Sequence, residues 1–212
     1  MFLITRPSHD ITTHYLYFWS DEIIDTAKKK NKRVVDLKKD KAIKSKVESY
    51  LKKQPIRLVM FNGHGSEDSV AGHQDQVLIK SSKNEKLLSS KIVYCRSCKS
   101  GKKLAPDSII SCADAFIGYD DDFIFYYDDN MSSRPLNDKT AAQFLKPTNK
   151  IITSLLKGHS VEDALKKSEE EFNKNIQNLV TSDTSESDMS SLRFLIWDKA
   201  HQTYHGDGQA TY

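Results

Sequence analysis

Two reactive side chains in this sequence, an imidazole and a thiol, each follow a short apolar run. His64 comes shortly after the run Leu58–Phe61, and Cys98 comes shortly after the run Ile92–Cys95. Both runs are bounded by polar residues or glycine and are too short for a helix, so each predicts a buried strand. Parallel strands deliver the residues that follow them to one edge of a sheet, so we expect His64 and Cys98 to lie close together. A thiol beside an imidazole has the parts of a nucleophile with its base.

Around these two runs, the chain alternates between short apolar runs and longer amphipathic stretches. Short apolar runs predict strands, and apolar residues at spacings of three and four predict helices. Over the first 61 residues this gives the order β-α-β-α-β, which implies a parallel sheet with right-handed crossovers. The predicted strands are Phe2–Thr5, Arg33–Leu37, Leu58–Phe61, Ile92–Cys95, Ala115–Gly118 and Leu192–Trp197, with Tyr204–Tyr212 as an edge strand or tail. The predicted helices lie within His14–Lys30, Lys41–Lys53, Asp138–Leu145, Thr148–Lys157 and Ser160 to about Leu179.

Three polar stretches are predicted to form loops. Ser66–Lys80 is expected as a loop and small hairpin over the site, and Thr181–Ser190 as a loop of its own. Tyr119–Pro135 is expected as a loop that carries aspartates among aromatic residues. Loops next to reactive side chains often bind ligands. The candidates for a substrate pocket are therefore Asp120, Asp121 and Asp122.

The composition is that of an ordinary globular chain. Its 212 residues suffice for one α/β domain spanning 1–212, and 38% hydrophobic with 29% charged residues argues against disorder. The net charge of +3 is weak, so we interpret the lysine-rich runs as solvated helix faces and expect neither nucleic acid nor a membrane as partner. Three cysteines without an export signal predict reduced thiols and a cytoplasmic location.

Several short motifs accompany the two reactive residues in a fixed order. The first strand ends in His64-Gly65, and the second leads into RSCKSG at 96–101. Downstream follow ADAFIG at 113–118, LKGHSVEDAL at 156–165 and HGDG at 205–208. From about residue 57 to the C-terminus, this pattern resembles the caspase-like (clan CD) cysteine peptidases, most closely the bacterial CHAT and gingipain-like proteases. The last motif departs from theirs, with Gly208 where they have proline.

The resemblance implies an α/β three-layer sandwich of caspase-haemoglobinase type with a mainly parallel central sheet. It also implies a cysteine endopeptidase that acts on protein or peptide substrates through a thioester acyl-enzyme. Cys98 would be the nucleophile and His64 the base, without a cofactor or a metal, and a regulatory protein partner is compatible with this class. If Lys99–Lys103 begins a helix, its N–H groups would favour the thiolate. The backbone N–H groups of Gly65 and Cys98 are the candidates for an oxyanion hole. No residue that orients His64 can be named.

The residue before the scissile bond is expected to contact Arg96. In the families that this chain resembles, the position two before the catalytic cysteine lines the specificity pocket. A guanidinium there would pair with a carboxylate and repel a basic side chain, so an acidic preference is expected. The aspartates at 120–122 could instead select a basic residue, and a pocket with both signs would favour a small or polar one.

Three other interpretations remain open. A caspase-like fold could act as an interaction or scaffold module that docks a partner without cutting it. Cys95-x-x-Cys98 has metal-ligand spacing, and His64 and His73 could complete a zinc site. A metal-stabilised nucleic-acid binder would use the lysine-rich helices.

Overall fold

The computed structural model of the chain describes residues 1–180 and 186–212, with the side chains of all but 186–188. Its centre is a six-stranded sheet in the order β2-β1-β3-β6-β7-β8. The strands are β1 (Phe2–Arg6), β2 (Val34–Lys38), β3 (Leu58–Asn62), β6 (Ile92–Arg96), β7 (Ala115–Tyr119) and β8 (Gln202–Gly206). The first five run parallel, and β8 pairs antiparallel with β7 at one edge. A separate hairpin pairs β4 (Ser69–Ala71) with β5 (Val77–Lys80).

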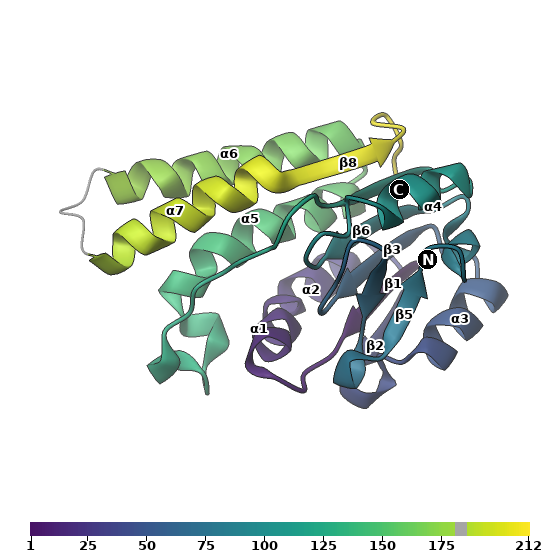
Figure 1. The fold of residues 1–212 in the computed structure, drawn as a ribbon, viewed down its shortest axis with the longest axis horizontal. Coiled ribbons are helices and arrows are strands. Elements are labelled where there is room, and N and C mark those ends of the chain that lie inside the picture. Colours follow the sequence, from purple (N-terminus) through teal and green to yellow (C-terminus); the bar gives the residue numbers. More distant parts are fainter. Residues whose placement is uncertain (181–185) are drawn as a thin grey trace.

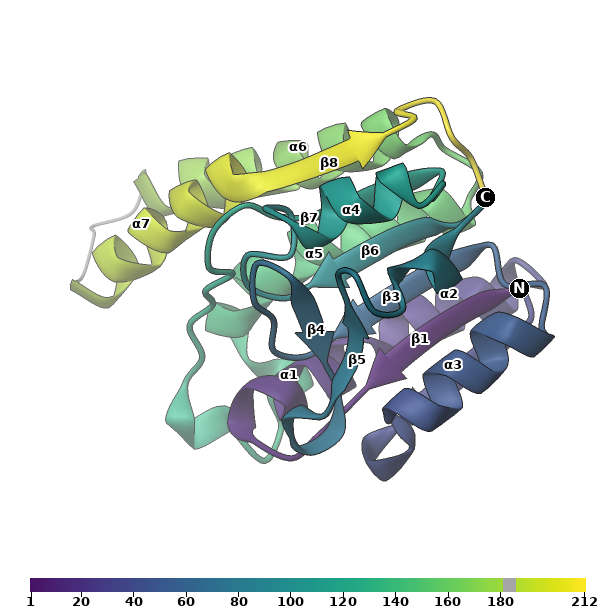
Figure 2. The same ribbon diagram turned by 45° about the vertical axis from the view of Figure 1, so that its right-hand side comes forward.

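Helices cover both faces of this sheet (Figure 1). One face carries α1 (Ile11–Trp19), α2 (Asp21–Lys29) and α5 (Lys139–Leu156). Beyond α5, α6 (Val161–Val180) packs on α5, and α7 (Glu186–His201) packs on α6 and extends past the sheet from the start of β8 (Figure 1). The other face carries α3 (Lys44–Lys53), α4 (Leu104–Ile110) and the hairpin, which lie in front of the sheet in Figure 2. The four central strands β1, β3, β6 and β7 therefore bury both of their faces: in β1, Phe2 and Ile4 enter one core and Leu3 enters the other. Burial on both faces explains the continuous apolar runs of the sequence.

The segment predicted as a single helix within His14–Lys30 forms two helices that meet at Ser20. The Ser20 hydroxyl donates to the Leu16 carbonyl at 2.6 Å, and Arg96 donates to the same carbonyl from the neighbouring strand. Ser20 then serves as the C-cap of α1 and the residue before α2. The helix break therefore depends on a tertiary contact: the buried Arg96 side chain donates to the Leu16 carbonyl and to Ser20 Oγ at the end of α1.

The two helices predicted within Asp138–Leu145 and Thr148–Lys157 are one continuous helix, α5. Pro147 lies inside it and supplies no N–H to the carbonyl of Gln143, four residues earlier. Asn175 of α6 supplies the missing donor, because its side-chain amide donates to the Gln143 carbonyl at 2.7 Å. The helix therefore passes through the proline with this acceptor satisfied.

The prediction of a strand at Leu192–Trp197 is wrong, because these residues belong to α7. Buried Ser191, Leu195 and Asp198 are spaced by four and three, which is a helical period that the short apolar run concealed. Of the loop predicted at 181–190, residues 181–185 lie outside the described chain and 186–190 begin α7.

The predicted edge strand near Tyr204 is present as β8, which begins at Gln202 and continues directly from α7 (Figure 1). Across the described residues, the structure has no helix with the length and apolarity that a membrane crossing requires.

Candidate active site

The candidate residues gather at the edge of the sheet where the parallel strands end. His64 follows β3 and Cys98 follows β6, its neighbour in the sheet. Asp10 follows β1 on the other side of β3, and the aspartates at 120–122 follow β7. The fold therefore brings the residues that follow four adjacent strands to one side of the molecule, which is where open α/β sheets build their sites.

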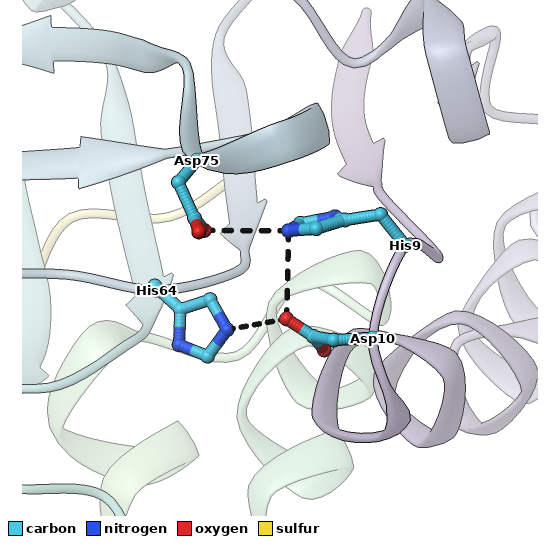
Figure 3. A group of neighbouring side chains, drawn as sticks. All are labelled: His9, Asp10, His64 and Asp75. Atoms are coloured by element: carbon cyan, nitrogen blue, oxygen red, sulfur yellow. Dashed lines mark hydrogen bonds and ion pairs between the residues drawn. The ribbon is translucent and has the colours of Figure 1, made fainter.

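The His64 imidazole is held by a carboxylate that the sequence did not point to. His64 Nε2 lies 2.7 Å from Asp10 Oδ2 (Figure 3). Asp10 is the N-cap of α1, and its other oxygen, Oδ1, accepts the Thr13 backbone N–H at 2.7 Å. Burial acts to raise the pKa of Asp10, but the hydrogen bonds from the Thr13 backbone and from His64 outweigh it and lower that pKa. An ionised carboxylate on Nε2 leaves Nδ1 as the free nitrogen of the ring.

The backbone after His64 packs directly on the backbone around Cys98. A side chain at Gly65 would place its Cβ 2.6 Å from the Cys98 carbonyl oxygen and 2.8 Å from Ser97 Cβ, so only glycine fits this approach. Within the described chain, neither the Gly65 N–H nor the Cys98 N–H donates a hydrogen bond. Two unpaired N–H donors thus lie on two backbone segments that touch.

The helix expected to begin at Lys99–Lys103 is absent from this position. Residues 98–103 form turns, Lys99 has a φ of 56°, and α4 begins only at Leu104. Hydrogen bonds to the segment around the end of β7 hold this turn. The Lys99 N–H donates to the Asp121 carbonyl at 2.9 Å, and the Gly101 N–H donates to the Tyr119 carbonyl at 2.8 Å. No helix dipole therefore acts on Cys98 from this segment.

The Cys98 thiol is partly buried and faces acceptors. Its Sγ lies 3.7 Å from the Phe123 carbonyl oxygen and donates to it. Burial raises the pKa of Cys98, and the negative charges of Asp122 and Asp198 raise it further. The Lys99 ammonium lies 3.2 Å from Asp122 Oδ2 and partly neutralises that carboxylate. This environment favours the protonated form of the thiol.

The three aspartates after β7 have different surroundings. Asp120 Oδ1 lies 2.6 Å from His201 Nδ1, at the end of α7. Asp121 holds the Lys99 backbone through its carbonyl, and the Asp122 carboxylate lies beside the Cys98 thiol. Asp121 and Asp122 therefore border the candidate nucleophile, whereas Asp120 binds the C-terminal end of α7.

The structure corrects the prediction that Arg96 contacts a substrate. Its side chain is fully buried, on the face of β6 that packs against α1, α2 and α5. Its N–H groups donate to neutral acceptors at 2.9–3.4 Å: Asn62 Oδ1, Thr148 Oγ1, Asn149 Oδ1, the Leu16 carbonyl and Ser20 Oγ. All five donors of the guanidinium are used inside the protein, so it presents nothing to a ligand. The expected acidic preference loses its structural basis.

The structure does not assemble the zinc site suggested by Cys95-x-x-Cys98. Cys95 is fully buried in the apolar core on the α3 and α4 side of the sheet, where burial raises its pKa well above the ordinary value. Among the described side chains, one group has the spacing of metal ligands, and it consists of His9, Asp10, His64 and Asp75. Neither cysteine and not His73 belongs to it.

Comparison with solved structures identifies the architecture. Over 99% of its length, the chain superimposes on the Arg-specific cysteine proteinase gingipain R with a TM-score of 0.60 and 12% sequence identity. A complex of the pro- and mature domains of the Porphyromonas gingivalis enzyme matches over 98% of the chain, with a TM-score of 0.58 and 11% identity. The chain has the caspase-haemoglobinase fold. It spans just under half of those chains, 46% and 47% respectively. No family model and no curated protein matches its sequence. The likeness supports the clan CD fold and does not single out the CHAT proteases.

Within the caspase-haemoglobinase fold, Asp10 is the site residue that sequence reasoning missed. Its partner His64 is 54 positions away, and no motif links them. One signal was present: Asp10 precedes a helix at the end of a predicted parallel strand, so it had to lie at the same sheet edge as His64. The pairing of β1 with β3 was the missing piece of information.

Proposed function

We propose that this chain is a cysteine endopeptidase in which Cys98 is the nucleophile and His64 the base. The observation that carries the proposal is the contact between Asp10 and His64. A carboxylate on Nε2 fixes the ring and directs Nδ1 to the remaining task, the transfer of a proton. The contact of Gly65 with the Cys98 backbone supports it, because it joins the segments that carry the base and the nucleophile.

The chemistry follows in two halves. Cys98 Sγ attacks the substrate carbonyl carbon while its proton passes to His64 Nδ1, and the oxyanion accepts the N–H groups of Gly65 and Cys98. The carbon–nitrogen bond then breaks, His64 returns the proton to the leaving amine, and a thioester remains. Water attacks the thioester, gives one proton to His64, and releases the acid as Cys98 regains its thiol. An oxyanion donor of this kind contributes about 3–4 kcal/mol of barrier lowering.

The resting thiol has to be activated when substrate binds. It donates to the Phe123 carbonyl and has a raised pKa, which is unfavourable for a nucleophile. A substrate that enters between Cys98 and the 120–125 segment would displace this contact and exclude water from the pair. Catalytic hydrogen bonds that are loose in an unliganded protein commonly tighten in this way.

The substrate would be a protein or peptide, and an acidic residue before the scissile bond is disfavoured. Arg96 is buried, and the carboxylate that borders the thiol is Asp122. Its charge repels an acidic side chain and attracts a basic one, although Lys99 weakens both effects. We therefore expect basic or neutral residues to be accepted ahead of acidic ones.

Covalent labelling tests the proposal. A peptide electrophile with lysine before the reactive ketone should modify Cys98, identified by mass spectrometry of the digested chain. Cys98→Ala should abolish labelling and peptide hydrolysis, and His64→Ala should slow both by on the order of 10²-fold or more. The matched control is Cys112→Ala, which removes an exposed cysteine and should change neither.

The alternative is an interaction module that has this fold but does not cut peptide bonds. The specific observation in its favour is that the partly buried Cys98 thiol donates to the Phe123 carbonyl beside Asp122, surroundings that raise its pKa. Labelling that is absent, or that occurs equally in Cys98→Ala, would reject the peptidase and favour this module.

A further inference from the structure

Four side chains with metal-ligating atoms converge where Asp10 meets the His64 imidazole. They are His9, Asp10, His64 and Asp75, and one ligating atom of each lies within 4.8 Å of every other (Figure 3). They come from three segments: the turn after β1, the end of β3, and the short 3-10 helix between β4 and β5. Two imidazole nitrogens and two carboxylate oxygens that converge in this way are a donor set for a divalent metal ion.

The two spacings around His9 are those of a tetrahedral site. His9 Nε2 lies 3.4 Å from Asp10 Oδ2 and 3.3 Å from Asp75 Oδ1. Zinc bonds of about 2.0–2.1 Å to nitrogen and oxygen separate tetrahedral ligand atoms by roughly 3.3–3.4 Å. His64 Nε2 and Asp10 Oδ2, now 2.7 Å apart, would move apart by roughly 0.6 Å when a metal replaces the proton between them. The His64 side chain is 43% exposed and has room for this small rotation.

The donor types select the class of ion. Imidazole ligands suit zinc and its neighbours among the transition metals, whereas Ca²⁺ and Mg²⁺ take oxygen ligands. The carboxylates of Asp10 and Asp75 balance the double charge of the ion and offset the partial positive charge at the start of α1. Asp10 caps α1 through Oδ1 and faces the cluster through Oδ2, so one side chain can serve both purposes.

The cluster is accessible to an ion without opening of the fold. The Asp75 side chain is 65% exposed, and that of His9, which contacts it, is 13% exposed. A cavity of about 300 Å³, lined by residues 8–11 and 14, opens next to His9 and Asp10.

We propose that His9, Asp10, His64 and Asp75 bind a zinc-class divalent ion that holds the chain inactive. The site itself is independent of the peptidase proposal, and its inhibitory effect rests on that proposal. A metal on Nε2 leaves the ring proton on Nδ1, so His64 has no free lone pair with which to accept the Cys98 proton. The ion also takes the carboxylate that orients the ring. Removal of the ion by a chelator restores both groups.

A direct binding measurement tests the site. Zn²⁺ is titrated into the purified full chain against a competing chelating dye, and Co²⁺ absorption reports tetrahedral coordination. We expect one ion per chain and at least tenfold weaker binding in His9→Gln and in Asp75→Asn. The control His159→Gln, which removes a histidine outside the cluster, should bind as the unaltered chain does. Circular dichroism verifies that each variant is folded. No stoichiometric binding, or equal affinity in the folded His9 and Asp75 variants, overturns the site.

A second measurement tests the inhibition and separates it from the peptidase proposal. Zn²⁺ should slow labelling of Cys98 at least tenfold, and a chelator should restore it. His9→Gln and Asp75→Asn should label at the unaltered rate without metal and should resist Zn²⁺. If Zn²⁺ binds the cluster while labelling continues, the inhibitory effect is refuted. If labelling never occurs while binding is normal, the peptidase and the inhibition fail together and the metal site stands.

Discussion

Asp10 and His64 meet at 2.7 Å although they follow different strands and are 54 positions apart in the sequence. The same carboxylate group caps a helix with one oxygen and holds an imidazole with the other. The orientation of the proposed base is therefore coupled to the start of α1, and any shift of that helix moves the ring. This coupling allows its structural and chemical parts to be separated by substitution.

Asp10→Asn should preserve helix α1 but impair the proposed base, His64, by removing the carboxylate that orients its ring. Asparagine caps helices as well as aspartate does, so the free energy of unfolding should change by less than about 0.5 kcal/mol. Without the carboxylate on Nε2, Cys98 labelling should slow by on the order of 10²-fold. Asp10→Ala, which loses the cap as well, should cost about 1 kcal/mol of stability. Labelling rates are measured with a chelator present, and an Asp10→Asn rate equal to that of the unaltered chain would contradict the assigned role.

The reaction of Cys98 with a small alkylating agent should accelerate with pH beyond the ordinary thiol range. Burial, Asp122 and Asp198 raise the pKa of Cys98, so less thiolate is present at neutral pH than in a free thiol. Asp122→Asn removes one of the opposing charges and should move the midpoint of the pH–rate curve downward. Iodoacetamide rates, measured by mass spectrometry with Cys112 followed in the same samples, give the curve. A midpoint below neutrality would show that the unliganded thiol is already activated.

Arg96→Met should destabilise the fold severely. The substitution keeps most of the volume but leaves Asn62, Asn149 and Thr148 with unpaired buried groups. Loss of several charged hydrogen bonds should lower the free energy of unfolding by about 3 kcal/mol or more. Urea unfolding measures the change. Arg57→Met removes a side chain that is 61% exposed and forms a surface ion pair, so it should cost under about 1 kcal/mol. A folded Arg96→Met chain with normal stability and altered peptide preference would restore the specificity role.

Asp198→Asn should stabilise the protein at neutral pH. Asp198 is fully buried, its Oδ1 accepts the Ile124 N–H at 3.0 Å, and its Oδ2 has no hydrogen-bond partner in the described chain. Burial raises its pKa well above the ordinary value, so above about pH 4 the folded chain binds a proton that the unfolded chain releases. The contribution of the Asp198 carboxyl group to the free energy of unfolding is thus fully present below about pH 4. It falls by about 1.4 kcal/mol per pH unit above that, up to the pKa of Asp198 in the folded chain.

Asparagine has no such titration, so the difference between Asp198→Asn and the unaltered chain should grow from pH 4 towards pH 7. Urea unfolding at several pH values measures it, with Asp129→Asn, at an exposed position in a short 3-10 helix, as the charge-matched control. A difference that does not change with pH would mean that Asp198 is ionised in the folded chain.

The central strands could be predicted because burial on both faces produces uninterrupted apolar runs, as in Leu58–Phe61 and Ile92–Cys95. These runs also placed His64 and Cys98 at one sheet edge. The prediction failed where a distant contact decides the local structure. Ser20 ends a helix because Arg96 reaches it from another strand, and α5 continues through Pro147 because Asn175 replaces the lost donor.

The wrong prediction for Arg96 and the missed role of Asp10 have the same explanation. Arg96 was judged from its neighbours in the sequence and Asp10 was missed, because the surroundings of both are set by strand pairing and by the face of the sheet that they occupy. Arg96 shares the face of Tyr94 and points into the core between sheet and helices, so its position two before Cys98 does not bring it to the surface.

The last strand of the sheet has a consequence for how the chain folds. β8 pairs with β7 across the largest sequence separation of any strand pair in the sheet, with α5, α6 and α7 in between. Closing so long a loop is slow, so we expect β8 to dock after the parallel strands have paired. Until then β7 presents an open hydrogen-bonding edge that a second chain can occupy. Refolding yield should therefore fall as chain concentration rises, through species that β7 joins edge to edge.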